Sequence, residues 1–234
     1  MGRRVPAGAA GLARGARRPA SWESLAVSVS RLVVVFYVAL ASLSAGVAAL
    51  ARDGHPFTHP SPWLALDERT ALTASALLGV SFAAAVVAST RVIAARFAWS
   101  RGLHAELRPF ARHLSAGQIA AVAALGSVGE ELFFRALLTP LLGVLISSAL
   151  FGLAHQMRGA SRWIWASWAA LVGLGLGSIF ALTGSLLGPL LAHAAINGLN
   201  LVFVRDTDPR PRAKKPLGGL FGAARSSLDL GAPT

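Results

Sequence analysis

The sequence contains a nearly uncharged interval, IAAVAALGSVGEELFFRALLTPLLGVLISSALFGLA (residues 119–154), whose only charged side chains are Glu130, Glu131 and Arg135. A continuous α-helix of this length would measure roughly 54 Å, whereas the hydrocarbon core of a bilayer is about 30 Å thick. One crossing cannot accommodate it. The interval therefore predicts two membrane-spanning helices joined by a turn.

The turn is expected at Pro140, which has no backbone N–H and disfavours helix at the preceding residue. This break gives spans near 117–138 and 141–157. Other charge-free stretches are each long enough for one further span: residues 32–51, 70–90, 163–182 and 186–204. The sequence thus predicts an all-α, polytopic integral membrane protein, a helical bundle of about six transmembrane helices.

The composition excludes several classes of protein. Hydrophobic residues make up 54% of the chain and charged residues 14%, and the mean hydropathy of +0.58 is too high for an ordinary soluble domain. The chain has no cysteine, which excludes disulfide bonds, a thiolate nucleophile and a thiolate metal site.

The formal net charge is +12, and the positions of the basic residues along the chain indicate what it means. The basic residues lie at the ends of the apolar stretches, without the interleaved aromatic residues that stack on bases, so we predict no nucleic-acid partner. The expected outer loops hold only Arg52 and Arg69, whereas the expected inner segments hold the remaining basic residues apart from Arg135, which lies within a span. By the positive-inside rule both termini should be cytoplasmic.

These patterns predict four regions along the chain. A basic, disordered cytoplasmic leader is followed by two N-terminal transmembrane helices with their connecting loops, a core of four transmembrane helices, and a basic, disordered cytoplasmic tail. Their predicted bounds are residues 1–31, 32–113, 114–204 and 205–234.

The adjacent carboxylates of the long interval indicate a functional site. An ionisable group at the centre of a bilayer costs about 2.5 to 3.5 kcal/mol on insertion scales, so such groups need a compensating role. Glu131 and Arg135 are four residues apart on one helix face and are expected to pair. Glu130 lies about 100° around the helix from Glu131 and remains available.

Two further polar pairs occur at a spacing of four residues in neighbouring spans: Phe151 with His155, and His193 with Asn197. A free carboxylate, two imidazoles and a carboxamide inside a helix bundle can hold and activate a water molecule. Glu130 would take the proton, and the His and Asn donors would stabilise an oxyanion on a scissile carbonyl. The predicted reaction is amide hydrolysis within the membrane.

The three motifs, EExxxR from Glu130, FxxxH from Phe151 and HxxxN from His193, occur in an order and spacing that resembles the CPBP family. These are the CAAX-processing and bacteriocin-processing intramembrane proteases, also called the Abi family. The resemblance covers roughly residues 116–204. It implies an all-helical membrane protease acting on a CAAX-like or other membrane-associated peptide, in a glutamate-based mechanism.

The resemblance also implies a role for each motif residue. Glu130 would activate water, His155 would position it, His193 and Asn197 would form the oxyanion site, and Glu131, Arg135 and Phe151 would support them. No cofactor is expected, because HExxH is absent. Zinc held by Glu130, His155 and His193 from three separate helices is the alternative.

Two other functions stay open at this stage. One is a catalytically silent membrane scaffold of the same fold. The other is a transporter or proton relay, although every candidate group lies between residues 130 and 197 and the two N-terminal spans carry none. The bias toward Ala, Gly and Arg favours a bacterial cell membrane, and neither the substrate nor the oligomeric state follows from the sequence.

Overall fold

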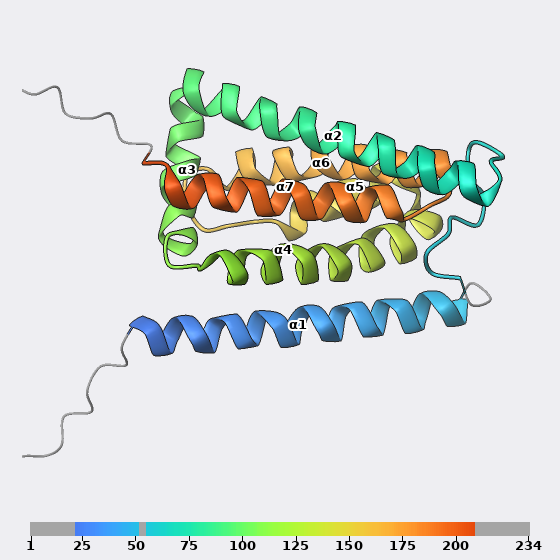
Figure 1. Cartoon of the computed structure of the whole chain (residues 1–234), viewed down its shortest axis with the longest axis horizontal. Coiled ribbons are helices and arrows are strands. Elements are labelled where there is room, and N and C mark those ends of the chain that lie inside the picture. The colour runs from blue at the N-terminus through green and yellow to red at the C-terminus, as the bar shows by residue number, and fades with distance from the viewer. Residues whose placement is uncertain (1–21, 52–54, 209–234) are drawn as a thin grey trace, which may run out of the picture.

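The computed structural model describes residues 22–51 and 55–208, which form a bundle of roughly parallel and antiparallel helices (Figure 1). The described residues contain no β-strand beyond a single bridge between Thr58 and Ser185. The elements in chain order are α1 (Trp22–Ala51), α2 (Glu68–Arg96), α3 (Ala98–Ala111), α4 (Ala116–Glu131), the π-helix η1 (Leu132–Leu138), α5 (Thr139–Ala154), α6 (Arg162–Thr183) and α7 (Leu187–Asp206).

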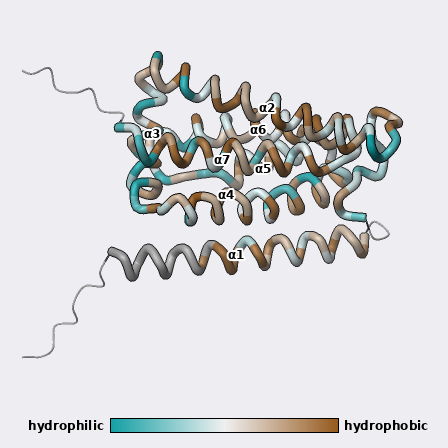
Figure 2. Tube along the Cα trace, in the orientation of Figure 1, coloured by the Kyte–Doolittle hydropathy of each residue, from teal (hydrophilic) through white to brown (hydrophobic). Residues whose placement is uncertain are grey.

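Five helical stretches in the described residues are long and apolar enough to cross a membrane, which confirms the predicted all-α membrane fold. Figure 2 shows hydrophilic residues gathered toward the two ends of the bundle, with a hydrophilic turn inside the otherwise hydrophobic α4. The five stretches are Val34–Ala51, Glu68–Arg96, Ala116–Ala154, Arg162–Thr183 and Leu187–Asp206.

The stretch from α4 to α5 is one helical run that reverses direction at Gly143. Gly143 has φ 81° and ψ 165°, a conformation that side chains with a Cβ rarely adopt. The limbs on either side contact each other, since the hydroxyls of Thr139 and Ser147 lie 2.8 Å apart. The prediction of a turn between two helices therefore holds, but the turn lies three residues after Pro140, and the second helix is shorter than the predicted span because it ends at Ala154.

Helix continues through Pro140 because of the π-helix η1 that precedes it. In an α-helix the proline ring collides with the carbonyl four residues earlier, and a π-turn shifts those carbonyls out of register. The hydroxyl of Thr139 donates to the carbonyl of Phe134, at 2.9 Å and five residues back. The helix passes the proline and turns only at the next glycine.

The N-terminal helix is longer than expected. α1 begins at Trp22, so residues 22–31, which were predicted to be part of the leader, are helical. Neither Gly nor Pro occurs between Trp22 and Ala45, and nothing in this segment opposes helix. The rest of the predicted leader, and the tail beyond residue 208, lie outside the described residues.

A short amphipathic helix, α3, replaces part of the loop expected after the second span. Leu103, Leu107 and Phe110 recur at helical spacing on one face, a pattern that the charged residues of this segment obscured. α3 lies across one end of the bundle, approximately perpendicular to the long helices (Figure 1). His104 binds the carbonyl of Thr207 at 2.9 Å and so ties α3 to the end of α7.

The long helices differ in how closely they pack. α2 and α7 approach until a Cβ on Gly79 or Gly188 would overlap the other helix. Ser75 reinforces this approach, because its hydroxyl accepts from the Gly188 N–H at 2.9 Å and donates to the Ser185 carbonyl at 2.8 Å. α1, in contrast, lies at the edge of the bundle against α4 and η1 (Figure 1).

Candidate active site

Glu130 and Glu131 are the last two residues of α4, and both are buried, with 8% and 0% of their surface exposed. The helix directs them to different surroundings. Glu131 enters a closed polar cluster, whereas Glu130 lines a cavity. This is the division that their 100° separation predicts.

Arg135 neutralises Glu131, as the sequence predicts. Its Nη1 lies 3.1 Å from Glu131 Oε1, and its Nη2 donates to the Gly173 carbonyl of α6 at 3.1 Å. The guanidinium also lies over the ring of Phe151, 4.3 Å from the ring centroid. Phe151 therefore supports the site as a cation–π partner for the buried arginine.

Glu131 has a second partner that the sequence did not reveal. Its Oε1 lies 2.7 Å from Nδ1 of His193 on α7. Because a carboxylate paired with Arg135 only accepts hydrogen bonds, Nδ1 of His193 carries the hydrogen. The ring orientation that follows directs Nε2 of His193 toward Glu130 Oε2, at 3.7 Å.

His155 faces the same oxygen from the end of α5. Its Nδ1 donates to the Phe151 carbonyl at 2.8 Å, since a carbonyl can only accept, and its Nε2 lies 3.4 Å from Glu130 Oε2. Two imidazole Nε2 atoms thus converge on one carboxylate oxygen. In a neutral ring with its hydrogen on Nδ1, Nε2 is an acceptor, and so is the carboxylate oxygen that it faces. The arrangement therefore favours a hydrogen between the imidazoles and Glu130, either as a shared proton or from a water molecule.

Tyr37 of α1 completes the surroundings of Glu130. Its hydroxyl donates to Glu130 Oε1 at 2.7 Å, across 93 residues of sequence. The expectation that the two N-terminal spans carry no such group is therefore wrong. The available signal was that Tyr37 is the only tyrosine of the chain and lies in a charge-free span.

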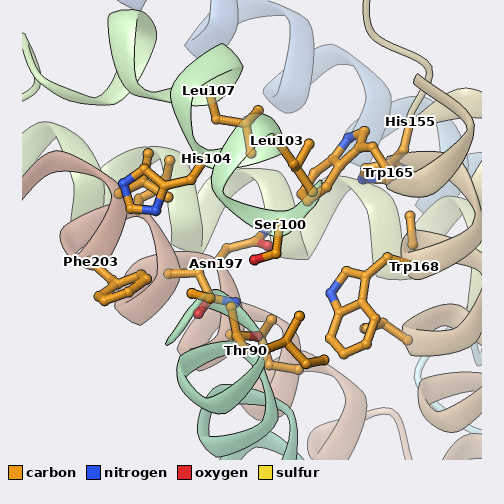
Figure 3. A pocket seen from close by; sticks show the side chains of 18 of the residues that line it. Thr90, Ser100, Leu103, His104, Leu107, His155, Trp165, Trp168, Asn197 and Phe203 are labelled. Atoms are coloured by element: carbon orange, nitrogen blue, oxygen red, sulfur yellow. The ribbon is translucent and has the colours of Figure 1, made fainter. Parts of the chain in front are cut away.

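These groups line one end of a cavity of about 310 Å³. Asn197, one helical turn after His193 on α7, also lines it, so the structure brings all four predicted catalytic residues to one cavity. Figure 3 shows Asn197 and His155 among the side chains that surround this space. Most of the remaining wall is apolar, and includes Trp99, Leu103, Leu107, Phe110, Trp165, Trp168 and Phe203.

The residues described by the structure do not include a group of three or more His, Cys, Asp or Glu side chains arranged to hold a metal ion. His193 uses one ring nitrogen on Glu131, and His155 uses one on a backbone carbonyl. The prediction that no cofactor is needed stays a prediction.

The fold and this cavity define a polytopic helical membrane protein with an intramembrane carboxylate–histidine centre. Residues 112–199 match the family model described as type II CAAX prenyl endopeptidase Rce1-like. The match is consistent with a CPBP family intramembrane protease and confirms the resemblance seen in the motifs. No curated protein and no solved structure matches the chain significantly.

Proposed function

We propose that this protein is an intramembrane endopeptidase in which Glu130 activates a water molecule that attacks a peptide bond. One observation carries the proposal: Glu130 Oε2 faces the Nε2 atoms of His155 and His193 at one end of an apolar cavity. A water molecule at this position would have a proton acceptor and two imidazoles within reach.

In the proposed first step Glu130 takes a proton from water while the water oxygen bonds to the scissile carbonyl carbon. His155, oriented by its contact with the Phe151 carbonyl, holds the water. The carbonyl oxygen becomes an oxyanion, and Asn197 and Nε2 of His193 donate to it. Glu131, 2.7 Å from Nδ1 of His193, holds the ring in the orientation that this contact requires.

In the second step the tetrahedral intermediate collapses. The C–N bond breaks, and the proton held by Glu130 passes to the leaving amine. Glu130 returns to the carboxylate, and the two products are a carboxylic acid and an amine.

The cavity wall supports a membrane-associated peptide as substrate. Aromatic and leucine side chains supply apolar contact area, and the family match makes a CAAX-like sequence the first class to test. We further propose a multi-pass protein of a bacterial cell membrane with both termini in the cytoplasm. The basic segments support this orientation, and α1 begins at the same end of the bundle as α7 ends (Figure 1).

The experiment compares protein N- and C-termini in membranes from cells that express the wild type, Glu130→Gln or Glu68→Gln at equal levels. Glu68 is exposed at the start of α2 and serves as the matched control. We expect new termini in the wild type and in Glu68→Gln that are absent from Glu130→Gln. Identical termini in all three samples would contradict the proposal and favour a scaffold or a transporter.

A further inference from the structure

We propose that Tyr37 is a positioning residue for the reaction: its hydroxyl holds Oε1 of Glu130 so that Oε2 faces His155 and His193. This inference rests on the proposed function, in which Glu130 is the base. It adds a residue of α1 to a site whose other catalytic members lie on α4, on α7 and directly after α5. Tyr37 also lies outside the matched residues 112–199.

The contact distinguishes the two oxygens of one carboxylate. Tyr37 donates to Oε1 at 2.7 Å, the length of a charge-assisted hydrogen bond. Oε2 is buried and lies 3.4 Å and 3.7 Å from the two imidazole Nε2 atoms, and within the described part of the chain it makes no hydrogen bond. Oε1 is thus fixed to the protein, and Oε2 remains for the proton that the reaction moves.

The surface of α4 is shaped to receive this side chain. A Cβ on Gly129 would lie 3.0 Å from the Tyr37 carbonyl oxygen and 3.2 Å from its ring Cδ1, and a Cβ on Gly126 would lie 3.4 Å from Cζ. Only glycine at position 129 leaves this space without displacing α1. The two glycines, three residues apart, form a slot that brings the phenol to Glu130 at the next helical position.

Removing the hydroxyl should affect the chemical step more than substrate binding. The terminal torsion of a glutamate is broad, so an unanchored carboxylate rotates between several orientations. Oε1 would also lose its donor in a buried position. The phenyl ring of Tyr37→Phe would still fill the slot, and we therefore expect kcat to fall while KM changes little.

The contact can be observed directly because the chain has a single tyrosine. Protein labelled with 3-fluorotyrosine, and purified with a tyrosine-free tag in detergent, should give one fluorine resonance. We expect Glu130→Gln to move this resonance, because the carboxylate acceptor is replaced by an amide, and Glu68→Gln to leave it in place. An unchanged shift in Glu130→Gln overturns the contact whether or not the protein is active.

The positioning role is tested by kinetics on the cleaved peptide. For Tyr37→Phe we expect kcat to fall about tenfold or more, the usual effect of a hydrogen bond to a charged group, with KM within about twofold of the wild type. Leu43→Val, at an exposed position of the same helix, is the control. Unchanged kcat in Tyr37→Phe overturns the positioning role and leaves the proposed function standing. A wild type that cleaves nothing contradicts the proposed function itself, and the fluorine shift still decides the contact.

Discussion

Glu130 and Glu131 are neighbours in the sequence and are both buried, yet their surroundings differ. Glu131 is enclosed by a guanidinium, an imidazole and a helix, and its charge is balanced. Glu130 lies against a cavity, with a phenol on one oxygen and two imidazoles near the other. A single step along the helix thus separates a structural carboxylate from one that has room to react.

The sharpest test of this comparison is Glu130→Gln. Amide replacement keeps the shape of the side chain but removes the proton acceptor, so we expect a loss of about 10³-fold or more in kcat. Thermal unfolding in detergent should remain close to that of the wild type. Full activity in this variant would show that Glu130 is not the base.

Arg135→Ala removes a partner of Glu131, so we expect it to lower the stability of the fold more than Glu130→Gln does. Removing one partner of a buried ion pair costs about 3 to 5 kcal/mol, because Glu131 is left charged and unpaired. The measurement is the yield of folded protein and its unfolding temperature, with Arg69→Ala at an exposed position as the control. Equal stability of the two variants would contradict the structural role of the pair.

Asn197→Ala tests whether the α7 face of the cavity acts in the transition state. Loss of one oxyanion donor lowers kcat by about 10²-fold to 10³-fold. We expect this effect without a change in folding temperature. Asn200→Ala is the comparison, because Asn200 receives a hydrogen bond from Arg91 of α2 at 2.8 Å and so joins two helices. A larger loss of kcat in Asn200→Ala than in Asn197→Ala would reverse the assignment.

The smallest expected effect is that of Gly129→Ala. The added methyl group pushes α1 away from α4 by a few tenths of an ångström and lengthens the Tyr37 contact, so kcat should fall by about threefold to tenfold. Gly117→Ala on the same helix is the matched control, since a Cβ there meets no atom within 4 Å. Equal kcat for both variants would contradict the role of Gly129 in positioning Tyr37.

The motif residues could be identified from the sequence because helical spacing fixes which side chains share a face. The pairing of Glu131 with Arg135 followed from a separation of four residues. The contact of Glu131 with His193 did not, because it joins two helices 62 residues apart. Tyr37 was missed for the same reason, since no local pattern links it to Glu130.

The turn in the long interval was misplaced for a different reason. Proline is the stronger local signal, but a π-helix accommodated Pro140, and the positive φ of Gly143 made the reversal. α3 was missed because its charged residues marked the segment as a loop, although its apolar residues follow helical spacing. Local rules therefore predicted that the long interval turns once, whereas packing decided where it turns.

The reversal at Gly143 is followed by only a short helical limb. The returning limb, residues 144–154, is about 16 Å long at helical rise, roughly half of the hydrocarbon thickness. The chain then continues without regular structure toward the end of the bundle where α3 lies (Figure 1). Irregular backbone at this depth persists only where protein or water satisfies its polar groups. The early end of α5 therefore places backbone that needs such partners beside His155, and in the proposed mechanism water there would be the second substrate.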